Sequence, residues 1–200
     1  MKPPIRILVA TIAAVVLSAC SALEEAQNER AREAYIAGDY QEALETWSRL
    51  ADKGNARAQN NMGVLYSQGK GVERDDETAL VWFRKSAQQG FVLAQANLGD
   101  SYFQGDVAPQ DYERAAQWYA LSARGGDDES QFYMGKILAD GLGMSRDPAR
   151  AYMWYSIAAM NGFEGADAAR IEISAKMTRQ ELTLAETLLS ECMTSGLDNC

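Results

Sequence analysis

The sequence predicts an all-α protein, a solenoid of antiparallel helix pairs, and three observations support this fold class. A pattern of 36 residues occurs three times in unbroken register, at residues 55–90, 91–126 and 127–162. Apolar residues at helical spacing occur twice within each unit. The chain of 200 residues contains only 4 prolines. A period of roughly 20–50 residues is typical of stacked supersecondary units rather than of a single globular core.

The register of the repeat is marked by glycines and tryptophans, residue types that chance rarely aligns. Each unit has one glycine inside its first helix, one after that helix, a tryptophan in its second helix and a closing glycine. In chain order these positions are Gly63, Gly99 and Gly135, then Gly69, Gly105 and Gly141, then Trp82, Trp118 and Trp154, then Gly90, Gly126 and Gly162.

The first helix of the first unit is expected over residues 56–67, where apolar residues recur at helical spacing. Gly63 lies inside this helix, although glycine costs about 1 kcal/mol relative to alanine there. Because every unit keeps this glycine, we expect a neighbouring helix too close for a Cβ. Gly69 follows the helix and suits a left-handed C-terminal cap.

The second helix of each unit is expected to begin after an aspartate, at Asp75, Asp111 and Asp147. An aspartate side chain accepts hydrogen bonds from the unpaired N–H groups of the first turn. Asp147 precedes Pro148, and proline is favoured at the first helical position. The three aspartates could be taken for a row of metal ligands. Consecutive repeats lie about 10 Å apart, so the three carboxylates cannot share one ion.

The three aligned tryptophans are interpreted as core between repeats, because they stand beside small residues at helical spacing. The alternative is a ladder of rings that stacks on carbohydrate.

Residues 1–19 are predicted to be a lipoprotein signal peptide. Two positive charges, Lys2 and Arg6, precede an uncharged and mostly apolar run at residues 7–17. This run is shorter than the ~20 residues of a membrane span. It ends in Leu17-Ser18-Ala19-Cys20, which resembles a bacterial lipobox and predicts a diacylglycerol on the thiol of Cys20. The alternative is an ordinary secretory signal with a chance cysteine.

Residues 20–28 would then form a lipidated tether at the membrane. Ser21 follows the cysteine where an aspartate would favour the inner membrane, so we expect the periplasmic face of the outer membrane. Loss of Lys2 and Arg6 on cleavage changes the formal side-chain charge from −9 to −11. Such a charge disfavours nucleic acid and anionic lipid, so the acyl chains would carry the attachment.

The units at the two ends are predicted to be atypical, because terminal repeats cap the stack. Residues 29–54 form a degenerate helix pair with a tight turn at Gly38-Asp39-Tyr40, and Trp47 takes the register position of Phe83. Residues 163–200 form C-terminal capping helices, the last of which begins with a capping box at residues 178–181.

Two cysteines near the C-terminus, Cys192 and Cys200, are predicted to form a disulfide if the protein is exported to an oxidising compartment. The alternative is two unpaired thiols. No metal site and no cofactor are expected, because two cysteines without any histidine provide too few of the usual ligands. The lack of histidine also removes Ser-His and Cys-His arrangements, so no catalytic residue is assigned.

The unit resembles the Sel-one-like repeat (SLR), a relative of the tetratricopeptide repeat (TPR). The residues that carry this resemblance in the first unit are Ala58, Gly63, Tyr66, Gly69, Gly71, Val72, Asp75, Ala79, Trp82, Ala87 and Gly90. The second unit departs from the pattern at Asp106-Val107-Ala108, and the third has Leu138 in place of tyrosine. The resemblance implies a right-handed α/α superhelix that acts as an adaptor with a concave groove for other proteins.

A binding surface is expected where the repeats differ, because positions that serve the fold repeat and positions that serve binding need not. First helices line the inner groove in related solenoids, and one stripe on them changes between units. Its members are Arg57, Asn61, Val64, Gln68, Leu93, Asn97, Asp100, Gln104, Glu129, Tyr133, Lys136 and Asp140. The alternative is an ordinary solvated helix face.

The sequence therefore predicts a non-enzymatic envelope lipoprotein whose groove binds a protein partner of unknown identity. An alternative is a cell-wall or β-lactam hydrolase, by analogy with relatives that carry a cysteine pair in every repeat. Residues 55–162 contain no cysteine, which argues against that alternative. A further alternative is a module that binds peptidoglycan.

Overall fold

A computed structural model describes the backbone of residues 5–197 and 200, and the side chains of residues 21–197 and 200. This part of the chain is built of α-helices and contains no strand. The helices are α1 (Ile5–Ala37), α2 (Tyr40–Asp52), α3 (Ala56–Gln68), α4 (Asp76–Ala87), α5 (Val92–Gln104), α6 (Tyr112–Arg124), α7 (Asp128–Asp140), α8 (Pro148–Met160), α9 (Ala166–Ser174) and α10 (Arg179–Thr194). The predicted all-α solenoid of helix pairs is confirmed.

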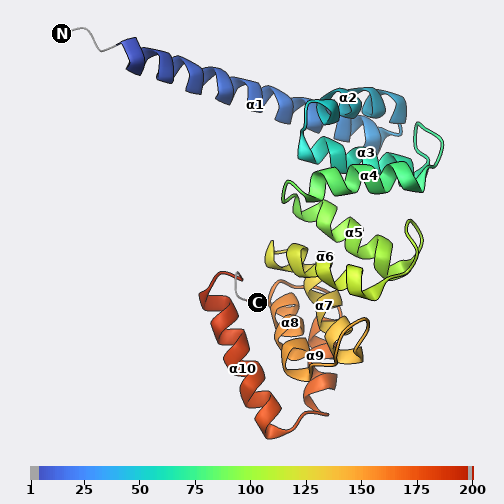
Figure 1. The fold of residues 1–200 in the computed structure, drawn as a ribbon, viewed down its shortest axis with the longest axis vertical. Coiled ribbons are helices and arrows are strands. Elements are labelled where there is room, and N and C mark those ends of the chain that lie inside the picture. The colour runs from blue at the N-terminus through green and yellow to red at the C-terminus, as the bar shows by residue number, and fades with distance from the viewer. Residues whose placement is uncertain (1–4, 198–199) are drawn as a thin grey trace.

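The helices stack along one axis, each packing on the helix before it from α1 to α9, and their long loops lie on one edge of the stack (Figure 1). The N-terminal half of α1 projects away from the stack. Residues 20–28, expected as a tether, belong to this helix, and Asn28 is already buried. The side chain of Cys20 lies outside the described part of the chain, and so does the predicted lipidation. No helix within the described residues has the length and apolar character that a membrane span requires.

Aspartate caps begin the second helices, as the sequence predicts. Asp75 accepts a hydrogen bond from the backbone N–H of Thr78 at 2.9 Å. Asp111 and Asp147 accept equivalent bonds at 3.0 Å from the third residue beyond each of them. The carboxylates are thereby used to satisfy the first turn of each helix.

The internal glycine of each repeat lies against an aromatic ring of the following helix. A Cβ added to Gly63 or Gly99 would lie 2.5 Å from the ring of Phe83 or Tyr119 respectively, well inside van der Waals contact. Gly135 meets Tyr155 in the same way, at 2.6 Å. The predicted close approach is confirmed. Gly69 adopts the left-handed conformation at φ 65°, as its capping role requires.

The tryptophans divide into two groups, so their interpretation as core needs a correction. Trp154 is 2% exposed and belongs to the core. Trp82 and Trp118 pack against the core but keep part of each ring exposed. Phe83 and Tyr119, the residues after these two tryptophans, pack on the internal glycines of their repeats. Trp82 and Trp118 therefore lie at the edge of the buried face of their helices.

Buried glutamines tie successive repeats together, a role that the sequence analysis missed. The side-chain amides of Gln59, Gln95 and Gln131 donate to the carbonyl oxygens of Ala51, Ala87 and Ala123, at 3.2, 3.3 and 3.1 Å. All three glutamines are buried and stand 36 residues apart. Each of these bonds satisfies a carbonyl group at the end of the preceding helix.

The C-terminal helices do not pair as the repeats do. The last helix, α10, packs on α8, which also contacts α7 and α9. Its predicted capping box is confirmed, with Glu181 accepting from the backbone N–H of Thr178 at 2.7 Å. A disulfide joins Cys192 to Cys200, whose Cα atoms are 5.1 Å apart. Since Cys192 is buried, this bond holds the end of the chain against the stack.

Candidate binding groove

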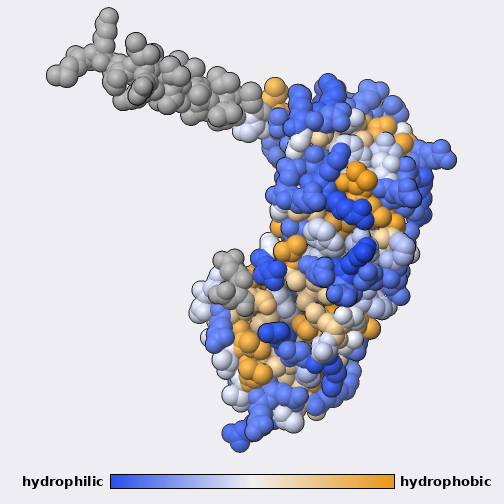
Figure 2. Space-filling model, viewed as in Figure 1, coloured by the Kyte–Doolittle hydropathy of each residue, from blue (hydrophilic) through white to orange (hydrophobic). Residues whose placement is uncertain are grey.

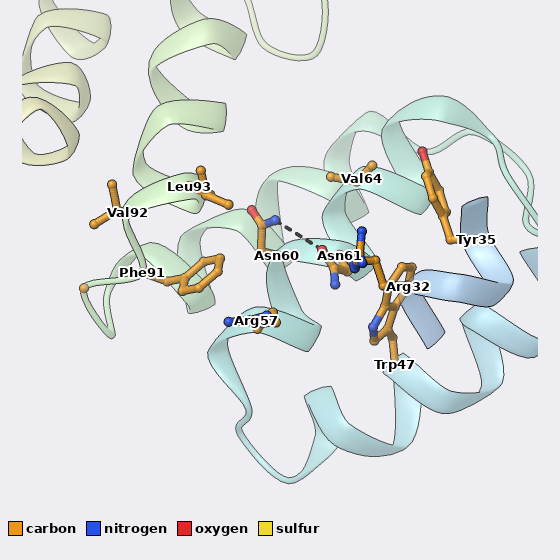
Figure 3. A pocket seen from close by; sticks show the side chains of 11 residues that line it. Arg32, Tyr35, Trp47, Arg57, Asn60, Asn61, Val64, Phe91, Val92 and Leu93 are labelled. Carbon is orange, nitrogen blue, oxygen red and sulfur yellow. Dashed lines mark hydrogen bonds between the residues drawn. The ribbon is translucent and has the colours of Figure 1, made fainter. Parts of the chain in front are cut away.

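The N-terminal helix pair, α3 and the turn between α4 and α5 enclose a pocket of about 490 Å³ (Figure 3). We call it the N-terminal pocket. Its lining residues are Arg32, Tyr35, Trp47, Arg57, Asn60, Asn61, Val64, Gly90, Phe91, Val92 and Leu93. Four of them, Arg57, Asn61, Val64 and Leu93, belong to the predicted stripe. The others come from α1, α2, the buried side of α3 and the turn.

The wall at the turn is apolar and open to solvent. Phe91 and Val92 are half-buried, and Leu93 is 54% exposed. On the opposite side lie Trp47 and Tyr35 (Figure 3). Trp47 is 3% exposed, and its indole Nε1 finds no acceptor among the described residues. A buried N–H without an acceptor is rare in proteins, so this group is a point at which a ligand would gain free energy.

Two arginines stand at the pocket, and each is held by a glutamate of α1. Arg32 donates from Nε to Glu29 at 3.0 Å, and Nη1 of Arg57 lies 3.1 Å from the carboxylate of Glu25. The hydrogen bond from Arg32 lowers the pKa of Glu29, so that carboxylate is ionised at neutral pH. The α1 glutamates thus orient two guanidinium groups that line the pocket, and Arg32 lies next to Trp47 (Figure 3).

The floor of the pocket is a chain of asparagine amides. Asn97 donates from Nδ2 to Oδ1 of Asn60 at 2.8 Å, and Asn60 donates onward to Oδ1 of Asn61 at 3.5 Å (Figure 3). This order places the Nδ2 group of Asn61 at the end of the chain, as a donor. Asn97 lines the next hollow, so the chain of amides links the N-terminal pocket to that hollow.

The second-repeat part of the stripe surrounds a smaller hollow of about 190 Å³, which Asn97, Asp100 and Gln104 help to line. Asp100 accepts a hydrogen bond of 2.6 Å from the hydroxyl of Tyr119. Burial raises the pKa of Asp100. Burial and the nearby Asp100 carboxylate also raise the pKa of Tyr119 well above its usual range, so the tyrosine remains the donor. Tyr133 stacks on Tyr119 with ring centroids 5.3 Å apart.

The third-repeat part of the stripe contributes to another hollow, of about 350 Å³, beneath α9. Lys136 and Asp140 line it and lie 3.5 Å apart as an exposed ion pair. Glu129 is exposed at the start of α7, where its partial burial and the charge of Asp100 raise its pKa. Gln68 is exposed at the end of α3 and accepts a hydrogen bond of 2.8 Å from the hydroxyl of Tyr35.

The structure therefore divides nine of the twelve stripe residues among three hollows instead of one continuous site, and Gln68, Glu129 and Tyr133 line none of the three. Figure 2 shows small hydrophobic patches among hydrophilic side chains on the face of the molecule in view. Within the described residues, no three acidic or cysteine side chains are placed to hold a metal ion. The chemistry of the groove is that of recognition by apolar contact, amide donors and charge.

The sequence analysis missed Arg32, Tyr35, Trp47 and Phe91 in the N-terminal pocket. Three of them lie in the degenerate first pair, where the repeat register gave Trp47 the position of Phe83 and so a packing role. Phe91 lies at a turn, where repeat alignment shows only that the preceding glycine recurs. No periodic signal in the sequence distinguished these residues as lining a pocket.

Comparison with known proteins identifies the repeat and the fold. The Sel1 repeat family model matches residues 56–91, 92–127 and 128–163. A structure of c5321, a protective antigen of uropathogenic Escherichia coli strains with an SLR fold, is 29% identical at a TM-score of 0.72. The match covers 90% of this chain and 43% of that one, so the chain spans less than half of c5321. A Sel1 repeat protein from Oxalobacter formigenes is 28% identical at a TM-score of 0.65, covering 85% and 78% of the two chains. No protein with a curated description matches the chain.

Proposed function

The chain belongs to the Sel1 repeat family, and we propose that it is a non-enzymatic adaptor that binds a protein partner through its groove. The observation that carries this proposal is the N-terminal pocket, in which an exposed apolar wall, an unpartnered indole N–H and two guanidinium groups converge. Leu93, the most exposed residue of this wall, belongs to neither of the core clusters that stack the repeats. Surfaces that combine apolar anchors with arginine are typical of protein recognition.

We further propose that the adaptor is a lipoprotein of the bacterial envelope, anchored through Cys20 at the periplasmic face of the outer membrane. The sequence Leu17-Ser18-Ala19-Cys20 and the charged, then apolar segment before it support this proposal. The related c5321 is a protective antigen, a property that fits a protein outside the cytoplasm. The disulfide between Cys192 and Cys200 also fits an oxidising compartment.

The lipid anchor is tested by metabolic labelling with radioactive palmitate in cells that express the chain. The unaltered chain is expected to be labelled and to fractionate with the outer membrane, and Cys20→Ala is expected to lose the label. Labelling of Cys20→Ala equal to that of the unaltered chain would refute the anchor. Fractionation with the inner membrane would refute only the outer-membrane assignment.

The adaptor function is tested by crosslinking in intact cells, followed by mass spectrometry. A specific protein is expected with the unaltered chain and is expected to be lost when groove charges are reversed, as in Arg57→Glu. Arg150→Glu, in α8, is the matched control because Arg150 is similarly exposed and also pairs with an acidic residue. If no protein is crosslinked in higher yield to the unaltered chain than to the charge-reversed variant, the result counts against the proposal. Purified protein is expected to leave peptidoglycan and nitrocefin unchanged, and turnover of either would show an enzyme.

A further inference from the structure

The N-terminal pocket has room and an apolar wall for a large apolar side chain together with part of the segment that carries it. Its volume of about 490 Å³ lies within the roughly 300–1,000 Å³ typical of ligand pockets. Val64, Phe91, Val92 and Leu93 face it from two helices and a turn. Leu93 keeps 54% of its surface exposed, so covering it removes apolar area from water.

The polar side chains of this pocket offer hydrogen-bond donors. Trp47 Nε1 has no acceptor among the described residues, and the asparagine chain ends in the Nδ2 group of Asn61. The hydroxyl of Tyr35 is already engaged in both directions, since it donates to Gln68 and accepts from Lys70. A pocket that offers donors selects a ligand that brings acceptors, and a carboxylate is the strongest acceptor among side chains.

The two guanidinium groups come from different helices, α1 for Arg32 and α3 for Arg57. Each is bonded to one glutamate of α1, and a guanidinium carries five N–H donors, so a second carboxylate can bind to each. One carboxylate, such as a chain terminus, would serve one arginine. Two carboxylates, one on either side of an apolar residue, would serve both arginines, and an internal segment of a chain can supply them from two acidic side chains.

The neighbouring part of the groove has the opposite preference. Beyond the asparagine chain lies Asp100 of α5, which is largely buried, and Glu129 stands on α7, the first helix of the following repeat. A partner segment that stayed acidic along the groove would meet these carboxylates at a cost in free energy. The acidic residues of the partner are therefore confined to the N-terminal pocket.

We propose that the N-terminal pocket binds an internal, extended segment of the partner protein in which acidic residues flank a large apolar one. The apolar side chain enters beside Leu93 and Trp47, and the flanking carboxylates accept from Arg32 and Arg57. This inference rests on the proposed adaptor function and defines the chemistry of the segment that the adaptor recognises.

The test uses the purified full-length chain and a synthetic peptide, acetyl-Gly-Glu-Asp-Phe-Glu-Asp-Gly-amide, with a fluorophore for anisotropy. Blocked ends remove any binding through a chain terminus. The peptide is expected to bind at least tenfold more tightly than two controls, one with Gln and Asn in place of its acids and one with Ala in place of Phe. Equal affinity for either control, or no binding by the acidic peptide, would overturn the proposal.

Variants on the surface locate the binding without disturbing the fold. Leu93→Ser and Arg57→Gln are each expected to weaken binding at least fivefold. Leu121→Ser and Arg150→Gln, exposed on α6 and α8, are the matched controls and are expected to bind as the unaltered chain does. Binding that is unaffected by Leu93→Ser would place the peptide elsewhere and overturn the proposal.

The outcomes separate this inference from the adaptor function. If cells give a specific crosslinked partner but the peptide tests fail, the adaptor function stands and the proposed acidic–apolar segment is refuted. If the peptide tests succeed but no partner is crosslinked in cells, the proposed ligand chemistry of the pocket stands and the adaptor function is refuted.

Discussion

The same three helices, α3, α5 and α7, contribute to two regions of the molecule. One is the seam, where their internal glycines, Gly63, Gly99 and Gly135, pack on an aromatic ring of the next helix. The other is the groove that the predicted stripe lines, and the two regions differ in how closely the repeats resemble one another. At the seam, a Cβ added to Gly63, Gly99 or Gly135 would lie 2.5, 2.5 or 2.6 Å from the nearest ring atom, so the three contacts are nearly identical. In the groove the same helices line hollows of about 490, 190 and 350 Å³ with different chemistry. The difference teaches that repetition specifies packing, whereas binding must be sought where the units diverge.

The largest effect is expected from removing a buried ring of the core. Trp154→Ala should lower the free energy of unfolding by about 3–5 kcal/mol, because it leaves a cavity where 2% of the side chain is exposed. Trp82→Ala is the comparison, because this ring is only half-buried, and a smaller loss is expected. Urea denaturation measures both. Equal losses would contradict the division of the tryptophans into two groups.

A single methyl group at the seam tests the glycine contact by the sign of its effect. Helix propensity alone would make Gly99→Ala stabilising by about 1 kcal/mol. The added Cβ would lie 2.5 Å from the ring of Tyr119, which its hydrogen bond to Asp100 holds in place. We expect overpacking to prevail, with a net loss of about 1–2 kcal/mol in the free energy of unfolding. A gain in stability would show that the ring moves freely.

Helix caps belong to the repeated part of the molecule, so their loss should affect stability alone. Asp147→Ala removes the acceptor for the N–H of Arg150 and should cost about 1 kcal/mol in the free energy of unfolding. Asp147→Asn keeps a side-chain acceptor and should cost little. Calorimetry of the two variants measures the difference. Equal melting temperatures for the two variants would contradict the capping role.

Asp100 stands where seam and groove meet, and its effect should depend on pH. Burial raises the pKa of Asp100 in the folded protein above its ordinary value of 3.8. The folded protein therefore binds the Asp100 proton more tightly than the unfolded chain does. The stability gained from this proton is fully present below pH 3.8 and is lost as pH rises through the folded pKa. Asp100→Asn, which can still accept from Tyr119, should be more stable than the unaltered chain at pH 7 by a margin that shrinks toward pH 4. If the stability difference between Asp100→Asn and the unaltered chain grew toward acid pH, the pKa of Asp100 would be lowered in the folded protein, not raised.

The smallest effect on stability is expected in the groove. Leu93→Ser should change the free energy of unfolding by no more than about 0.5 kcal/mol, because this side chain is mostly exposed. The same variant should weaken binding of the acidic peptide. Chemical denaturation and anisotropy on one preparation measure both effects. A large loss of stability would show that Leu93 belongs to the packing and would remove the contrast between seam and groove.

The sequence was sufficient for the seam because each seam position recurs. Gly63 and Asp75 could be assigned from their copies, as packing and capping residues, before any coordinates. The stripe on the first helices was found by the opposite criterion, as the positions without copies.

Contacts between elements far apart in the chain could not be predicted in this way. The N-terminal pocket joins Arg32 of α1 to Leu93 of α5, and neither residue has a periodic signal that refers to the other. The packing of α10 on α8 likewise depends on tertiary contacts, because the apolar stripe of α10 would serve equally well against α9. Trp82 was assigned to the core because helical spacing cannot separate a fully buried position from the half-buried one beside it.

The most direct test of the central claim, that binding lies in the non-repeating groove, is site-specific photo-crosslinking in intact cells. A photoreactive amino acid replaces Leu93 in the N-terminal pocket or Leu121 on α6, two exposed leucines with different surroundings. Position 93 is predicted to crosslink one specific protein, through a segment with acidic residues beside an apolar one, and position 121 is predicted to give none. Crosslinks of equal yield from both positions, or from position 121 alone, would contradict the claim.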